Sequence, residues 1–282
     1  MSNINERVGS AAKWSIFTEI IVKIISPITN MILARILVPE EFGVVATVTM
    51  IVSFADIFTD AGFQKYVVQH QFKTKEDEDL SINVAFWTNI TISILLWLFI
   101  FLFAEQIATT VGNPGLGRVI YIGAAILPMT SFSSIQAAIF RKNLNYKELS
   151  FIRIIVKFIP LVVTVPLALM KFSYWALIIG NIAGELCNTL LLTYFSTWKP
   201  NLIYRFDKLK EMLHFCMWSL METISSWLVT NSGIFVLGTL FSQYYLGIYK
   251  TGTTMVAQIT SLLVYHMYNI TMMNTRIYIL NS

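Results

Sequence analysis

Charged side chains inside long apolar stretches are the residues of this sequence whose types and spacing could do chemistry. Six of them form pairs spaced four residues apart, so that each pair shares one helical face: Glu19 and Lys23, Asp56 and Asp60, Arg153 and Lys157. Three others stand singly: Glu185, Glu222 and Lys250. An ionisable group at the centre of a membrane helix costs roughly 2.5–3.5 kcal/mol on insertion scales. Each therefore needs a partner, a water-filled cavity or a route to the membrane surface.

Depth within the apolar stretches separates these residues. We expect the deeper ones to line a cavity, because a lipid-facing charge at that depth is hard to maintain. Arg153 lies about a turn from the end of its stretch, and Asp60 and Lys250 lie near the ends of theirs, so their side chains could instead reach the membrane surface. Glu19 before Lys23 is also the favourable order for an intrahelical ion pair. The candidates for a substrate cavity are Lys23, Asp56, Arg153, Lys157, Glu185, Glu222 and Lys250.

Signatures of enzymatic chemistry are sparse. The histidines His70, His214 and His266 are scattered, and no cluster of His, Cys and carboxylates has the spacing of a metal site. The glycine-rich run 111–117 falls between two apolar stretches rather than between a strand and a helix, so it predicts a turn and not a phosphate loop. We expect no catalytic residue, no metal, no cofactor and no nucleic-acid partner.

The composition places these charged residues in a membrane protein. The chain has 282 residues, of which 56% are hydrophobic and 13% are charged, and its mean hydropathy is +0.65. A soluble core of this size could not bury so much apolar surface. Because about 20 mostly apolar residues cross the hydrocarbon layer, we expect an all-α, polytopic protein with eight spans: 14–36, 43–63, 81–104, 118–140, 149–170, 174–195, 213–238 and 245–267.

Lysine and arginine are unequally divided between the two sets of connections. The N-terminal segment and alternate connections hold twelve: Arg7, Lys13, Lys65, Lys73, Lys75, Arg141, Lys142, Lys147, Lys199, Arg205, Lys208 and Lys210. The other connections hold three: Arg35, Arg118 and Lys171. Because basic residues favour the cytoplasmic side, we expect both termini in the cytoplasm and the turns at Pro39 and Gly115 outside.

A fainter copy of the N-terminal pattern begins 204 residues further along the chain. The aligned positions include Trp14-Ser15 with Trp218-Ser219, Leu33 with Leu237, and Gly43 with Gly247. Each copy predicts a long apolar helix, a short turn that ends in glycine, and the start of a second helix. Repeats of this length are typical of transporters built from two related halves. We expect a six-helix unit at 1–200 and the start of a second unit at 201–282.

Prolines mark the first and fifth spans. Pro27, Pro160 and Pro166 each remove a backbone hydrogen bond and tend to bend a helix. Proline is common in membrane helices, so packing alone is an alternative explanation. Since these two spans combine a bend with a buried cation, we expect them to line the cavity.

The turn between the first two spans carries a recognisable motif. Residues 33–43 read Leu-Ala-Arg-Ile-Leu-Val-Pro-Glu-Glu-Phe-Gly, and the second copy ends in Leu246-Gly247-Ile248-Tyr249. The motif resembles the opening signature of the bacterial oligosaccharide flippases of polysaccharide biosynthesis, in the multidrug/oligosaccharidyl-lipid/polysaccharide exporter superfamily. The similarity covers roughly residues 9 to 265, and the residues that carry it are Trp14, Arg35, Pro39, Phe42, Gly43, Asp56, Gly62 and Gly247.

The resemblance implies two helical bundles around a cavity that opens alternately to each side of the cell inner membrane. The substrate would be an undecaprenyl-pyrophosphate-linked oligosaccharide for surface polysaccharide, O-antigen or lipopolysaccharide synthesis. Such a molecule needs cations and hydrogen-bonding groups in a hydrated cavity that is open sideways to membrane lipid. The polysaccharide polymerase machinery is a further expected partner. From their depth and charge, and not from the motif, we expect a positive field from Lys23, Arg153, Lys157 and Lys250, and pairing or proton uptake by Asp56, Glu185 and Glu222.

Family members usually continue through about twelve or more spans, whereas the second copy here stops after two helices. We expect a truncated, frameshifted or incomplete chain that does not transport on its own. Two other functions stay open. A cation-coupled multidrug exporter would favour an acidic cavity, and a membrane-embedded sugar polymerase or acyltransferase would have a large external loop with Arg or His motifs. The external loops expected here are short.

Overall fold

The computed structural model describes residues 2–60, 62–258 and 260, and the side chains of residues 14–59, 62–258 and 260. It begins with a helical hairpin of α1 (Ser2–Ile36) and α2 (Pro39–Asp60). Pro39 occupies the first position of α2, where its missing N–H leaves no helical hydrogen bond unmade. The carboxylate of Glu41 accepts a hydrogen bond from the N–H of Val38 at 2.9 Å, which closes the turn.

The rest of the described chain is also helical. Its elements are α3 (Phe63–Gln69), α4 (Lys75–Leu102), α5 (Ala104–Thr110), α6 (Gly117–Gly123), α7 (Ile126–Lys142), α8 (Tyr146–Ile159), the π-helix η1 (Pro160–Thr164), α9 (Val165–Leu169), α10 (Tyr174–Phe195) and α11 (Phe206–Leu240). A further helical segment runs over residues 243–258. The described residues contain no strand, so the expected all-α class is confirmed.

Seven helical stretches of the described residues are long and apolar enough to cross a membrane. They match the first seven expected spans, but several ends differ: α1 already begins at Ser2, α4 at Lys75 and α11 at Phe206. Hydropathy marks the apolar part of a helix, whereas the backbone hydrogen bonds continue into its polar ends. The eighth expected span, 245–267, begins in the 243–258 segment, and most of its second half lies outside the described residues.

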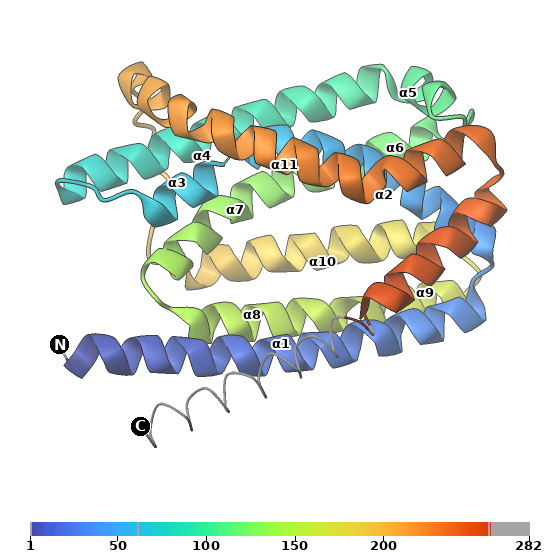
Figure 1. Ribbon diagram of the computed structural model, residues 1–282, viewed down its shortest axis with the longest axis horizontal. Helices are drawn as coiled ribbons and strands as arrows, with labels where there is room; N and C mark the ends of the chain where they lie inside the picture. Colours follow the sequence, from blue (N-terminus) through green and yellow to red (C-terminus); the bar gives the residue numbers. More distant parts are fainter. Residues whose placement is uncertain (1, 61, 259, 261–282) are drawn as a thin grey trace, which may run out of the picture.

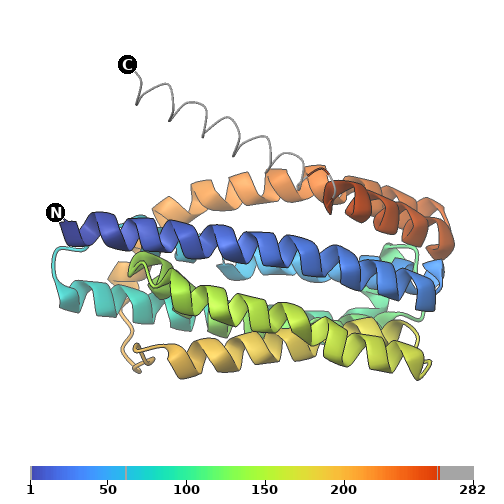
Figure 2. The ribbon, with the colours of Figure 1, turned by 90° about the horizontal axis from the view of Figure 1, so that it is seen from below.

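The long helices run between the same two ends of the molecule (Figures 1 and 2). The connections after α3, α7 and α10 lie at the end that holds the N-terminus, and the turns after α1, α5 and α9 lie at the opposite end (Figure 1). We call these the N-terminal end and the far end of the bundle. The loops rich in lysine and arginine therefore share the N-terminal end.

Helix α7 lies at the centre of the bundle and packs against α2, α3, α4, α8 and α10. At the N-terminal end it contributes Ile135 to an apolar cluster with Phe63 and Phe86. Towards the far end it contributes Leu127 to a second cluster with Ile120. These apolar contacts hold α7 in place between α4, α8 and α10.

The fifth span is not a continuous α-helix. The π-helix η1 begins at Pro160, and the N–H of Val165 bonds to the carbonyl of Pro160. Gly180 of α10 packs so closely here that a Cβ at this position would collide with the hydroxyl of Thr164. The expected irregularity at Pro160 is thus confirmed, and it takes the form of a widened turn that begins three residues after Lys157.

The glycine-rich run at the far end is a turn, as the sequence predicts. Gly112 and Gly115 have φ angles of 76° and 88°, which favour glycine. The carboxylate of Glu105 in α5 accepts hydrogen bonds from the N–H groups of Gly115 at 2.6 Å and Gly117 at 3.2 Å. These amides are therefore occupied by the protein's own carboxylate.

The two copies of the repeat touch each other at the far end. A Cβ on Gly247 would collide with the carbonyl oxygen of Pro39, and a Cβ on Gly43 would collide with that of Gln243. Since residues 39 and 243, like 43 and 247, are 204 positions apart, the two contacts are reciprocal, as across a two-fold axis. This geometry supports the repeat read from the sequence. The unit boundaries at 200 and 201 stay a prediction.

Candidate functional site

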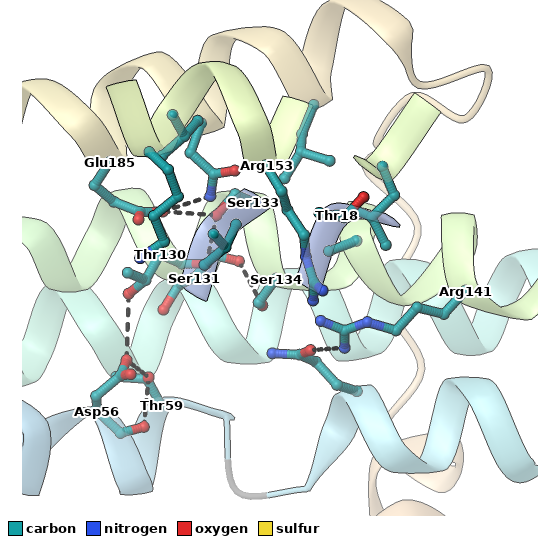
Figure 3. Close-up of a pocket in the computed structure, with 18 of the residues that line it drawn as sticks. Thr18, Asp56, Thr59, Thr130, Ser131, Ser133, Ser134, Arg141, Arg153 and Glu185 are labelled. Atoms are coloured by element: carbon teal, nitrogen blue, oxygen red, sulfur yellow. Dashed lines mark hydrogen bonds between the residues drawn. The ribbon is translucent and has the colours of Figure 1, made fainter. Parts of the chain in front are cut away.

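A polar cavity opens among the helices of the first repeat unit, towards the N-terminal end of the bundle. Its volume is about 500 Å³, and it is lined by α1, α2, α7, α8 and α10 and by Gln64 of α3. One wall is the polar face of α7, whose hydroxyl residues are Thr130, Ser131, Ser133 and Ser134 (Figure 3). The cavity thus combines hydrogen-bonding groups with a position inside the membrane-spanning helices.

Three cationic side chains line this cavity. Arg153 and Lys157 come from α8, and Arg141 comes from the last turn of α7. The guanidinium groups of Arg141 and Arg153 point into the same part of the cavity (Figure 3). Arg141 donates to the amide oxygen of Gln64 at 2.7 Å. Within the described part of the chain, neither Arg153 nor Lys157 forms an ion pair.

Three carboxylates line the cavity: Glu19, which pairs with Lys23, and Asp56 and Glu185, which are held by hydroxyl and amide groups. The carboxylate of Asp56 accepts from Thr59 at 2.8 Å and from Thr130 at 3.2 Å. That of Glu185 accepts from Ser133 at 3.1 Å and from Asn188 at 3.0 Å. Because Thr130 and Ser133 sit one turn apart on α7, this helix links the carboxylates of α2 and α10 (Figure 3). Hydrogen bonds of this kind stabilise a buried carboxylate without an ion-pair partner.

One buried hydroxyl of the cavity wall has no hydrogen-bond partner among the described residues. Ser131 is 1% exposed, and its Oγ makes no hydrogen bond. Leaving a buried polar group unpaired costs about 1–3 kcal/mol, so such a group is available to water or a ligand in the adjoining cavity.

The structure brings four of the seven candidates, Asp56, Arg153, Lys157 and Glu185, to this one cavity. The remaining three lie elsewhere. The ammonium of Lys23 lies 4.0 Å from the carboxylate of Glu19, so these residues form the intrahelical pair that the sequence allows as an alternative. Glu19 lines the cavity, and Lys23 does not.

The other two candidates also lie outside this cavity. Glu222 is exposed and forms an ion pair at 2.9 Å with Lys65 of α3, and Lys65 lines a separate groove between α2 and α11. Lys250 lines a separate pocket of about 210 Å³ together with Asn30 and Asn181. The side chain of Asp60 lies outside the described residues. The expectation that the first and fifth spans contribute to a cavity agrees with its lining by α1 and α8.

Sequence reasoning missed Arg141, Gln64 and the hydroxyl face of α7. Arg141 counts as a loop cation in the charge tally, but the structure places its side chain in the cavity. The signal that could have found the hydroxyl face is spacing: residues 130, 131, 133 and 134 recur at helical intervals within an apolar span.

Several of the motif residues shape turns rather than the cavity. Pro39 and Gly43 belong to the far-end contact with Gly247. Gly62 has a φ angle of 90° and faces Ser219 of α11. Phe42 packs against an apolar cluster that includes Leu33.

Trp14 and Arg35 lie at opposite ends of the apolar part of α1. The carbonyl of Trp14 accepts from the hydroxyl of Ser150 at 3.2 Å, which ties α1 to α8. Arg35 is exposed in the last turn of α1. Apart from Asp56, which lines the cavity, these motif residues therefore lie at turns and helix contacts rather than in the cavity.

A family model described as polysaccharide biosynthesis protein matches residues 32–272, which is most of the chain. This chain belongs to the polysaccharide biosynthesis protein family. The resemblance read from residues 33–43 is thereby confirmed. Together with the seven apolar helices, membership makes the chain a multi-pass membrane protein.

Curated relatives of the family agree with this assignment. The chain is 25% identical to the succinoglycan biosynthesis transport protein ExoT of Rhizobium meliloti (strain 1021), over 85% of this chain and 47% of ExoT. It is 25% identical to the lipopolysaccharide biosynthesis protein WzxC of Escherichia coli (strain K12), over 88% and 50%. It is 22% identical to the teichuronic acid biosynthesis protein TuaB of Bacillus subtilis (strain 168), over 89% and 51%.

The chain spans about half the length of these curated relatives. No solved structure matches it. Among the described residues, no group of three or more His, Cys, Asp or Glu side chains could hold a metal ion. The described lining offers binding chemistry: Arg153 and Lys157 without an ion-pair partner, Arg141 beside them, hydrogen-bonded carboxylates and a row of hydroxyl groups.

Proposed function

We propose that this polysaccharide biosynthesis protein takes part in moving a lipid-linked oligosaccharide across the cell inner membrane, as a flippase for surface polysaccharide or lipopolysaccharide synthesis. One observation carries the proposal: Arg153 and Lys157 line a polar cavity within membrane-spanning helices and have no ion-pair partner among the described residues. Cations held inside a bilayer are costly, and a substrate that carries anionic groups would compensate them.

The chemistry of the substrate fits the cavity. An undecaprenyl-pyrophosphate-linked sugar has anionic oxygens next to a polar glycan and an apolar tail. Arginine and lysine bind such oxygens through charge-assisted hydrogen bonds, which are stronger than neutral ones. Arg141, which also lines the cavity, would add a third cation. The hydroxyls of α7 would supply neutral hydrogen bonds beside them.

The names of the relatives support a transport role over catalysis. ExoT is named as a transport protein. We infer that this chain is not an enzyme, that its N-terminus is cytoplasmic, and that residues 1–200 form one unit while 201–282 begin a second. A polysaccharide polymerase is the partner that would receive the translocated unit.

A cation-coupled multidrug exporter is the alternative within the same superfamily. It would need carboxylates free to bind a cationic drug or a coupling ion. Here Asp56 and Glu185 each accept two side-chain hydrogen bonds and Glu19 pairs with Lys23, whereas Arg153 and Lys157 have no ion-pair partner among the described residues. The cations without a partner therefore favour an anionic substrate.

Binding of the lipid carrier tests the proposal. We would titrate detergent-purified protein with undecaprenyl pyrophosphate and with uncharged undecaprenol, and resolve the lipid adducts by native mass spectrometry. Hydrogen bonds to charged groups are worth about 1.5–3 kcal/mol each, so the double variant R153Q/K157Q should bind undecaprenyl pyrophosphate at least about tenfold more weakly.

The matched control removes two cations from the far end. R118Q/K171Q has the same change in net charge and should bind within about twofold of the unaltered protein. Equal affinity for undecaprenol and undecaprenyl pyrophosphate, or equal loss in both double variants, would contradict the proposed function.

A further inference from the structure

A polar groove, separate from the cation-lined cavity, lies between the two repeat copies, and we call it the α2–α11 groove. Its volume is about 360 Å³, and it runs between α2 and α11, which pack side by side (Figure 1). The α11 side is a polar stripe whose members recur every three or four residues: Ser219, Thr223, Ser226, Trp227, Thr230 and Asn231. Such a stripe in an otherwise apolar membrane helix faces polar contents more favourably than lipid.

The charge of this groove differs from that of the cavity. Among the described residues that line it, the ionisable ones are Asp56 and Lys65. Lys65 is already paired with Glu222 at 2.9 Å, and Asp56 accepts hydrogen bonds from Thr59 and Thr130. The described lining of the groove therefore offers hydroxyl and amide groups but no free cation, which suits a neutral polyhydroxyl molecule and not a phosphate.

The wall of the groove contains a buried serine, Ser219. It is 7% exposed, and within the described part of the chain its Oγ makes no hydrogen bond. The neighbouring Thr223 and Thr230 instead donate to carbonyls of their own helix at 2.8 and 2.9 Å. An unpaired hydroxyl so deeply buried is available to a ligand group in the groove.

The aromatic member of the stripe is fixed in place. The indole N–H of Trp227 donates to the hydroxyl of Ser53 at 2.9 Å, and its ring lies 4.8 Å from that of Phe54. An indole held in this way presents a rigid apolar surface beside the hydroxyls, and sugars carry both a hydroxyl edge and an apolar C–H face. The wall thus matches both kinds of sugar surface.

Asp56 connects the groove to the cavity, because it lines both. A molecule whose anionic group sits at Arg153 and Lys157 could therefore extend past Asp56 and reach the α11 stripe. We infer that the α2–α11 groove is a saccharide subsite that binds the neutral sugar of the lipid-linked substrate. This inference rests on the proposed function and assigns the two chemical parts of the substrate to two places.

The test compares a lipid without sugar and lipids with one. Native mass spectrometry of detergent-purified protein would measure the affinity for undecaprenyl pyrophosphate and for the same lipid bearing a single glucose or a single galactose. We expect the sugar-bearing lipids to bind more tightly. The variants T223V and S226A should each weaken binding of the sugar-bearing lipids about fivefold and change binding of the bare lipid less than twofold.

The control lies on another face of the same helix. Ser225 donates to the carbonyl of Met221 at 2.9 Å and does not line the groove, so S225A should change no affinity more than twofold. R153Q/K157Q should weaken binding of all three lipids. This pattern separates the groove from the cavity.

Ser219 gives a second variant that does not depend on disturbing the fold. Because its hydroxyl is buried and unpaired within the described residues, S219A should leave the melting temperature unchanged or raise it. The same variant should bind the sugar-bearing lipids about fivefold more weakly. If the bare lipid binds but the sugar adds no affinity, or S219A and T223V act like S225A, the subsite is wrong and the flippase proposal stands. If no pyrophosphate lipid binds, both are wrong.

Discussion

Arg153 and Lys157 share one face of α8, yet the sequence separates them by depth. Arg153 is near enough to the end of its span to reach the membrane surface, and Lys157 is one turn deeper. In the structure both side chains line the cavity, but they differ in whether they can also reach the membrane surface. Arg153 can extend to phosphates or water there, whereas the deeper Lys157 cannot.

This difference gives the first prediction. In a full-length protein that carries these residues, Lys157→Ala should lower polysaccharide export more than Arg153→Ala, because Lys157 lies deeper in its span and is farther from the membrane surface. Surface polymer would be measured at matched membrane levels of the two variants. Equal output from both would count against a substrate contact at Lys157.

Gly62 supports a second prediction at this scale. Its φ angle is 90°, and a Cβ here would lie 2.6 Å from that of Ser219. Gly62→Ala should therefore lower the free energy of unfolding by about 1–2 kcal/mol for the left-handed backbone and by more for the collision.

Gly115 is the matched control for this substitution. Its φ angle is 88°, but nothing lies within 4 Å of a Cβ at that position, so Gly115→Ala should incur the backbone cost alone. Unfolding in mixed micelles would compare the two variants. A Gly62→Ala loss no larger than that of Gly115→Ala would show that the contact with Ser219 is loose.

At the scale of elements, the two hairpin turns bring the repeat copies into close contact. Gly43 and Gly247 allow it, because a Cβ on either would meet a backbone carbonyl of the other copy. Asn113 adds a hydrogen bond from the amide of Gln243. This packing closes the far end of the interface between α2 and α11, where the α2–α11 groove does not extend.

The third prediction follows from this contact between the two turns. Gly247→Ala should destabilise the protein by about 1–3 kcal/mol, because the backbone of Pro39 cannot yield as a flexible side chain would. Gly252→Ala, five residues further along the same helical segment, has nothing within 4 Å and should stabilise it by about 0.5–1 kcal/mol. Melting temperatures in detergent would separate the two. The contact between Gly247 and Pro39 is disproved if both variants shift the melting temperature in the same direction.

The helices were more predictable than the cavity they enclose. Seven apolar spans follow from hydropathy because the bilayer demands about 20 apolar residues in each. Short helices such as α3 and α5 do not cross the bilayer and need no long apolar stretch, so hydropathy did not predict them. The far-end glycines were marked by the repeat, since a motif that recurs at equivalent positions records a shared backbone geometry.

The site was only half predictable, for a physical reason. Charges in apolar spans are costly enough to stand out, so Asp56, Arg153, Lys157 and Glu185 could be named in advance. Serine and threonine satisfy themselves on their own helix and carry little insertion cost, so the hydroxyl faces of α7 and α11 give no comparable signal. Which charges pair, as Glu222 does with Lys65, depends on the packing of distant elements.

At the scale of the whole molecule, residues near the N-terminal end line the cavity and the groove, while the glycine contacts close the far end. The loops rich in lysine and arginine share the N-terminal end (Figure 1). If that end is cytoplasmic, this arrangement would accept a substrate made on the cytoplasmic side. Export would then require the far-end contact at Gly43 and Gly247 to open.

Topology is the fourth prediction. Single cysteines placed at Lys75 and Lys142 of a chain lacking Cys187 and Cys216 should be shielded from an impermeant reagent added to intact cells. Cysteines at Pro39 and Gly115 should react. Permeabilised cells provide the control that all four sites can be labelled. Labelling at 75 or 142 from outside would reverse the orientation.

The most direct test of the cation-lined cavity is an experimental structure of the protein with undecaprenyl pyrophosphate bound. We predict that phosphate oxygens lie within about 3 Å of the guanidinium of Arg153 and the ammonium of Lys157, the distance of charge-assisted hydrogen bonds. The isoprenoid chain should leave the cavity sideways into lipid. A pyrophosphate bound elsewhere, for example beside Lys250, with the cavity along α8 free of any headgroup, would contradict the central claim.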